Sequence, residues 1–185
     1  MDSGEYRRDY AAYRSALERE RFGQHSGLVT QPDSKPFEER YADLWTREAI
    51  ESLRLRLDET PAQFETERAA LRALAGAASL KFAEKIALEV EGELRRCEDS
   101  ARFDWQGRRL SSDEAPELIA VETDAARRRE LAARWFGEVR RCDDLRAARL
   151  EILDEAARAL GFGSRLALRE SVDGISPGKL SSAAE

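Results

Sequence analysis

The fold of this chain is decided by residues 60–97, TPAQFETERAALRALAGAASLKFAEKIALEVEGELRRC. The segment begins like a helix, because Thr60 can cap, Pro61 suits the first helical position and Gln63 can complete a capping box. Apolar residues then recur every three, four or seven positions, as on one face of an α-helix. The pattern predicts one very long helix, about 55–60 Å at 1.5 Å per residue. Its apolar face comprises Phe64, Leu71, Leu74, Ala78, Phe82, Ile86, Val90 and Leu94.

A helix of this length must bend, project or find another surface, because a domain of 185 residues has a radius of gyration of only about 16 Å. Gly76 and Gly92 are its weak points, since glycine costs about 1 kcal/mol relative to alanine inside a helix. Its apolar face also needs a cover. Either other helices of the same chain provide that cover, or a missing half of a larger protein or a second copy does so, the latter in a homodimer.

The remaining sequence predicts further helices and one exception. Around residues 102–110, the pair Gln106-Gly107 separates two short runs, which favours a small β-hairpin, although a plain loop fits nearly as well. We therefore expect an all-α fold, an elongated bundle of five to seven helices. It forms a single domain over residues 1–175 and ends in a flexible tail over residues 176–185. Further helices are predicted at residues 5–21, 36–45, 46–57, where Thr46 can cap, and 111–121. Thr123-Asp124 caps the next helical stretch, which resumes or continues to Leu160, with Gly161 as the glycine after its end. Gly163-Ser164 begins a last short helix.

Composition excludes several classes of protein. Apolar residues make up 42% of the chain and charged residues 37%, the latter well above the usual value of about 25%. The net charge of −6 argues against general binding of nucleic acid, which needs a basic face. No apolar run approaches the roughly 20 residues of a membrane span. Residues 1–5, MDSGE, do not resemble a signal peptide, so we expect a cytoplasmic protein.

Few residues offer catalytic chemistry. The chain has one histidine, His25, and two cysteines, Cys97 and Cys142. They lack the spacing of a zinc site, and isolated cysteines without a signal peptide are typical of cytosolic thiols. The acidic pairs Glu38-Glu39 and Asp143-Asp144 are adjacent on predicted helices and so do not face each other. We therefore predict no catalytic, cofactor-binding or metal-binding residue, and no cofactor.

Two further features each have two interpretations. The stripe Tyr6, Tyr10, Tyr13 and Leu17 is more typical of a core-facing aromatic face than of a base-stacking surface. The run Arg127–Arg129 fans around most of a helical turn, which indicates a solvated surface.

One eight-residue segment occurs twice. GELRRCED at residues 92–99 recurs as GEVRRCDD at residues 137–144, so that equivalent positions are 45 residues apart. This spacing is typical of helical-hairpin repeats, but helices rich in Glu and Arg also produce such matches by chance. A disulfide between Cys97 and Cys142 would require Cα atoms within about 7 Å, which the sequence does not determine.

The order of motifs in residues 40–175 is distinctive. After the long helix come FDWQGRRL (103–110), SDEA (112–115), LIAVETD (118–124), RRREL (127–131), RLEILDEAA (149–157) and LGFGS (160–164). This order resembles the N-terminal helical half of zinc metallopeptidases of the thimet oligopeptidase and oligoendopeptidase type. The resemblance implies a helical wall of a peptide channel. The H-E-x-x-H helix that binds zinc in that family has no counterpart here, so the resemblance transfers no catalytic residue.

The leading hypothesis is a non-catalytic helical module that resembles the peptide-channel half of such a peptidase and acts by binding or association. The alternative is a stand-alone helical scaffold or adaptor without peptidase ancestry. A true enzyme is the third and weakest hypothesis, because a cysteine nucleophile would need a nearby base. The expected partner is a peptide, another protein or a second copy of the chain, with no nucleic acid and no membrane.

Overall fold

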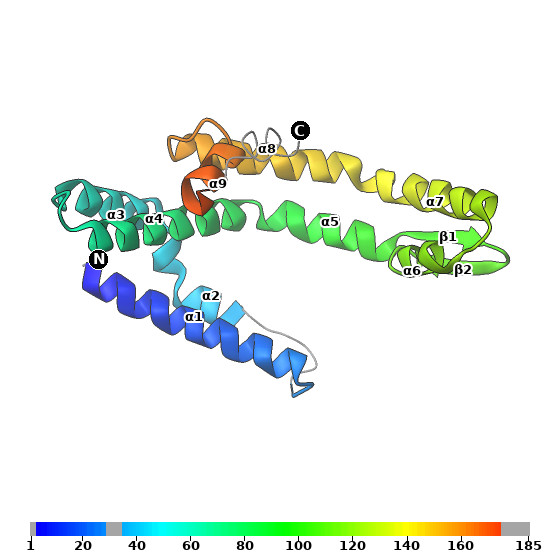
Figure 1. Ribbon diagram of the computed structural model, residues 1–185, viewed down its shortest axis with the longest axis horizontal. Coiled ribbons are helices and arrows are strands. Elements are labelled where there is room, and N and C mark those ends of the chain that lie inside the picture. The colour runs from blue at the N-terminus through cyan, green and yellow to red at the C-terminus, as the bar shows by residue number, and fades with distance from the viewer. Residues whose placement is uncertain (1–2, 29–34, 175–185) are drawn as a thin grey trace. The chain divides into compact units, whose positions relative to one another are not determined.

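The computed structural model describes residues 3–28 and 35–174, and it confirms a mostly helical fold with one small β-sheet. None of the described helices is long and apolar enough to cross a membrane. The flexible tail expected at residues 176–185 lies outside the described residues. The elements are α1 (Ser3–His25), α2 (Lys35–Arg40), the 3-10 turn η1 (Ala42–Trp45), α3 (Arg47–Glu59), α4 (Glu65–Ile86), α5 (Leu88–Ser100), β1 (Arg102–Trp105), β2 (Arg108–Ser111), α6 (Glu114–Val121), α7 (Ala125–Val139), the 3-10 turn η2 (Arg140–Cys142), α8 (Asp143–Ala159) and α9 (Arg165–Asp173) (Figure 1).

The very long helix is not confirmed. The helix ends at Ile86 and a new one begins at Leu88, so the predicted element is divided into α4 and α5 at Ala87. Its predicted start is also wrong. Thr60 is the C-cap of α3: its backbone N–H and its hydroxyl both donate to the carbonyl oxygen of Arg56, at 3.1 and 2.7 Å. A turn then separates Thr60 from the first residue of α4, Glu65.

The chain divides into two compact units. Unit 1 consists of the described residues of Met1–Glu84 and Ala156–Glu185, and unit 2 is Lys85–Glu155. The expected single domain over residues 1–175 stays a prediction, because two units of one chain can belong to one domain.

The core of unit 1 is aromatic at its centre. Tyr13 and Trp45 are both buried and meet edge to face, with ring centroids 5.0 Å apart. The Tyr6 hydroxyl donates to the carbonyl oxygen of Leu44 at 3.0 Å, and burial, with the charge of Tyr10 as a smaller cause, raises the pKa of Tyr6 above its ordinary value. The tyrosine stripe therefore faces the core, as the preferred interpretation predicts. Further buried members of this cluster are Leu44, Ala49, Ile50, Leu53, Leu71, Leu74, Ala75, Ala78 and Leu160.

Unit 1 also covers much of the apolar face of α4. Leu71, Leu74 and Ala78 are buried in its core, and Phe82 packs against that core. Ile86 remains half exposed. The same chain thus provides the cover for most of this face, so the face gives no reason to expect a homodimer through it.

Unit 2 contains the β-hairpin, which the structure confirms. Strands β1 and β2 pair antiparallel, with Phe103 opposite Leu110 and Trp105 opposite Arg108. The turn residues Gln106 and Gly107 have φ angles of 51° and 77°, the left-handed geometry that the tight hairpin turn requires. Figure 1 shows α6 beside this hairpin. Phe103 and Leu110 form a small core with Ala115 of α6 and Leu131 of α7. We call the hairpin, α6 and α7 the hairpin head.

Several predicted helix ends are confirmed. Asp124 caps α7 by accepting from the backbone N–H groups of Ala126 and Arg127, and Ser164 caps α9. Gly161 has a φ angle of 86° after α8. It donates to Arg158, while the next residue donates to Ala157, which together make a Schellman motif.

Candidate functional site

A hollow opens at the turn end of the hairpin head. Side chains alternate between the two faces of a strand, so Trp105 and Arg108 share a face with the buried pair Phe103 and Leu110. Where that core ends, a space of about 250 Å³ remains, which we call the hairpin-head hollow. It is lined by Trp105, Gln106, Arg108, Leu118, Val121, Glu122 and Leu131.

The aromatic wall of the hollow is held in place by α7. The Arg134 guanidinium lies 5.9 Å from the centroid of the Trp105 ring, a cation–π distance. The same guanidinium donates to the carbonyl oxygen of Asp104 and to the Glu130 carboxylate. Trp105 therefore lies between the hairpin and an arginine that is salt-bridged to Glu130.

The two charged groups of the hollow differ in how they are paired. The Glu122 carboxylate accepts from the backbone N–H of Asp124 at 3.0 Å and lies 3.9 Å from Arg127. Arg108 is 68% exposed, and its ion pair with Glu114 is 4.0 Å long. Glu114 is already engaged, because the backbone N–H and the hydroxyl of Ser111 donate to it and lower its pKa. Arg108 is thus the weakly paired charge of the hollow.

The apolar rim of the hollow is open to solvent. Val121 in the last turn of α6 is 72% exposed, whereas Leu131 of α7 is buried. Such an arrangement allows an apolar side chain to enter from solvent and reach a buried floor. The sequence does not indicate this hollow, since its lining comes from four elements whose approach depends on tertiary packing. The only local signal was the Trp105-Gln106-Gly107-Arg108 turn.

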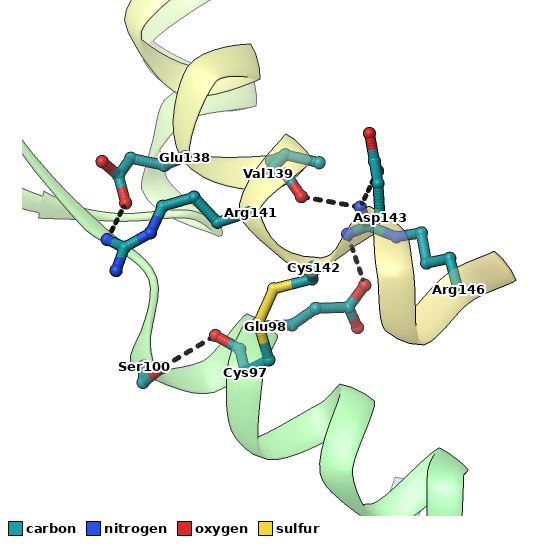
Figure 2. The surroundings of a disulfide bond; sticks show 9 residues. All are labelled: Cys97, Glu98, Ser100, Glu138, Val139, Arg141, Cys142, Asp143 and Arg146. Atoms are coloured by element: carbon teal, nitrogen blue, oxygen red, sulfur yellow. Dashed lines mark hydrogen bonds and ion pairs between the residues drawn. A yellow bond between two sulfur atoms is a disulfide. The ribbon is translucent and has the colours of Figure 1, made fainter. Parts of the chain in front are cut away.

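A second feature of unit 2 is a disulfide between Cys97 and Cys142, whose Cα atoms are 6.0 Å apart (Figure 2). Cys97 lies in the last turn of α5, and Cys142 ends η2. Cys142 is 1% exposed, whereas Cys97 is only partly buried. The expectation of two isolated thiols is therefore wrong, because packing of distant helices brings the two sulfur atoms into bonding distance.

Two arginines of α8 add to the connection between α5 and α8. Arg146 donates to Glu98 on α5 and to Asp143 on its own helix, each at 2.7 Å, and the bond to Glu98 is the main cause that raises its pKa (Figure 2). Arg149 donates to Glu91 of α5. Glu98 and Asp143 occupy equivalent positions of the eight-residue repeat, as do the two cysteines.

The other sequence candidates are dispersed. His25 is exposed, and its Nδ1 lies 2.8 Å from the carbonyl oxygen of Arg21. Glu38 pairs with Lys81 at 3.0 Å. The run Arg127–Arg129 is exposed, as predicted for a solvated surface. Within residues 3–28 and 35–174, no three His, Cys, Asp or Glu residues form a group that could hold a metal ion.

Comparison with protein-family models, with curated proteins and with solved structures gives no significant match to this chain.

Proposed function

We propose that this chain is a non-catalytic helical module that binds a peptide segment of another protein at the hairpin-head hollow. The carrying observation is an apolar floor, Leu118 and Leu131, beside the weakly paired guanidinium of Arg108. We propose that the occupant is a segment with one apolar side chain next to a carboxylate.

The size of the hollow supports this choice of occupant. Pockets for cofactors and drug-sized ligands usually measure roughly 300–1,000 Å³. A space of about 250 Å³ is smaller than that range and suits one side chain. Trp105 on its wall offers the kind of rigid aromatic surface that is enriched at protein interfaces.

Charge supports the carboxylate. A hydrogen bond between arginine and a carboxylate is roughly twice as strong as a neutral one. Arg108 is the group that can supply such a bond, since the Glu122 carboxylate already accepts from a backbone N–H. A cationic ligand would meet Arg108 unfavourably.

The relationship to oligopeptidases remains part of the proposal. It rests on the motif order of residues 40–175 alone. The sequence encoded directly downstream tests it: an H-E-x-x-H segment there supports peptidase ancestry, and its absence favours the stand-alone scaffold. A cytoplasmic location also stays a prediction, and the disulfide counts against it, because disulfides persist mainly in oxidising compartments.

The binding proposal is tested with four fluorescein-labelled peptides that differ at one dipeptide: Glu-Leu, Gln-Leu, Lys-Leu and Glu-Ser. Fluorescence anisotropy should rank Glu-Leu first and Gln-Leu about tenfold weaker, the equivalent of one charge-assisted hydrogen bond. Arg108→Gln should remove the preference for Glu over Gln. Arg109→Gln is the matched control, because Arg109 follows on the same strand and does not line the hollow.

Two results would contradict the proposal. One is the absence of binding by any of the four peptides, and the other is an equal preference for Glu in the Arg108→Gln and Arg109→Gln variants. Val121→Asp should abolish binding without unfolding the chain, since Val121 is mostly exposed. Leu166→Asp, at an exposed position outside the hollow, should leave binding unchanged.

A further inference from the structure

The Cys97–Cys142 disulfide closes the base of the hairpin head. The two cysteines are 45 residues apart in sequence, and β1, β2, α6 and α7 all lie between them. Breaking this bond therefore releases a loop that contains the whole hairpin head. Release of this loop concerns unit 2 alone and does not depend on what the hairpin-head hollow binds.

The two sulfur atoms differ in their accessibility to a reductant. Cys142 is 1% exposed, whereas Cys97 in the last turn of α5 is partly exposed. Thiol–disulfide exchange begins when a thiolate attacks one sulfur in line with the other, so access decides which sulfur is attacked. Attack at Cys97 is favoured, with Cys142 as the leaving group.

Unit 2 has contacts between α5 and α8 other than the disulfide. Arg146 donates to Glu98 and Arg149 donates to Glu91, so two side-chain contacts join α8 to α5 in addition to the disulfide (Figure 2 shows the first). The hairpin head has its own buried cluster around Phe103 and Leu131. Two thiols held near each other in this way can form the disulfide again.

We propose that Cys97–Cys142 is a reversible redox clasp, opened by a dithiol that attacks Cys97. A thiolate of the dithiol forms a bond to the Cys97 sulfur, and the Cys97–Cys142 bond breaks with its electron pair on Cys142, which takes up a proton. The second thiol of the dithiol loses its proton and attacks the dithiol sulfur that is bonded to Cys97, which releases Cys97 as a thiolate. Two electrons pass to the protein, and the dithiol leaves as a disulfide. The open state lacks the covalent link at the base of the hairpin head.

The first test measures reduction of the oxidised full chain by dithiothreitol, with alkylation and mass spectrometry at timed points. Native protein should be reduced no more than about tenfold slower than protein in urea, since one sulfur is accessible. A greater slowing would show a disulfide that opens only on unfolding and would overturn the proposal. With glutathione as a monothiol probe and an acid quench, the adduct should lie on Cys97. An adduct mainly on Cys142 would equally overturn it.

The second test measures re-formation of the disulfide after dithiothreitol is removed. The native pair should return in a monomer, and Arg146→Gln should slow its return about threefold, in line with the modest strength of a part-exposed ion pair. Arg95→Gln is the matched control, because Arg95 is 73% exposed and pairs with Glu91 within its own helix. Two results would contradict the proposal that α8 keeps the two thiols close together. One is failure of the Cys97–Cys142 disulfide to form again in the unaltered chain, and the other is an equal rate of disulfide formation in the two variants.

Discussion

In unit 1, Tyr13 and Trp45 meet edge to face in a core that also buries Ile50 and Leu71. In the helical part of unit 2, the disulfide joins α5 to η2, the turn before α8. The arginines Arg146 and Arg149 join α8 to α5. The first kind of stability grows with the apolar area removed from water. The second depends on a covalent bond and on charges that remain partly exposed, which respond to reductant, salt and pH.

This difference follows from composition along the chain. Unit 1 carries three tyrosines in α1 and a tryptophan in η1, so large rings are available where these elements meet α3 and α4. The segments of unit 2 that face each other are rich in arginine and glutamate, as in the repeat GELRRCED and GEVRRCDD. Apolar side chains are buried on these helices as well, Val90 and Leu94 on α5 and Leu153 on α8, so the specific bonds add to apolar burial there.

The largest expected effect is loss of the disulfide. Replacing both cysteines, Cys97→Ser with Cys142→Ser, should lower the free energy of unfolding of unit 2 by about 4 kcal/mol, the chain-entropy value for a closed loop of this length. Hydrogen exchange with mass spectrometry should show faster exchange in α5 and α7, with α3 and α4 unchanged. The unaltered chain treated with dithiothreitol is the control and should behave like the variant. Equal losses in both units would contradict the division.

A slightly smaller effect is expected in the core of unit 1. Ile50→Ala should cost about 3 kcal/mol, since Ile50 is fully buried and the substitution leaves a cavity. Leu55→Ala in the same helix is the matched control and should cost less than about 0.5 kcal/mol, because Leu55 is 61% exposed. Urea unfolding followed by hydrogen exchange should place the loss in α3 and α4. A loss of the same size in both variants would contradict the packing described for α3.

The sequence predicts local features of both units more reliably than their tertiary contacts. Asp124, Ser164 and Gly161 act where the chemistry of helix ends places them, and Gln106-Gly107 makes the expected turn. Each of these depends on a few neighbouring residues, so a single sequence contains the necessary information.

The errors lie where two different local structures use similar residues. Thr60-Pro61 resembles a helix start, yet the Thr60 hydroxyl ends the preceding helix instead. The break at Ala87 has no glycine or proline to mark it, while Gly76, predicted as a weak point, lies inside an unbroken helix. A Cβ at Gly76 would lie 2.7 Å from Val172 of α9, so this glycine allows close helix packing.

Neither the candidate site nor the disulfide could be predicted, because both depend on which elements pack together. Trp105 and Leu131 are 26 positions apart in the sequence, and they line one hollow because two strands and two helices pack together. Periodicity identifies the buried face of each element separately, but it does not determine which faces meet.

The smallest expected effects are opposite pH responses of the two units. Backbone N–H groups, that of Arg127 first and Ala126 second, lower the pKa of Asp124 below its ordinary 3.8, and hydrogen bonds from Ser111 lower that of Glu114 below 4.5. A carboxylate whose pKa is depressed by folding stabilises the folded state above its unfolded pKa, and this contribution is lost as the pH falls through the folded value. Tyr6 in unit 1 has a raised pKa, so its contribution is complete below its ordinary value of 10.0 and is lost as the pH rises above it.

Hydrogen exchange across a pH series, corrected for the intrinsic exchange rate, should therefore show acid weakening α6 and α7 of unit 2 below about pH 4. Alkali should weaken α1 and η1 of unit 1 above about pH 10. Asp124→Asn provides a matched control for acid, because asparagine caps a helix as well as aspartate but does not titrate in this range. Tyr6→Phe provides the control for alkali, since it removes the titrating hydroxyl. Two results would contradict this prediction: equal responses of both units at each extreme of pH, or full pH dependence in the two variants. Either result would mean that the general charge of the chain, and not these side chains, controls its stability there.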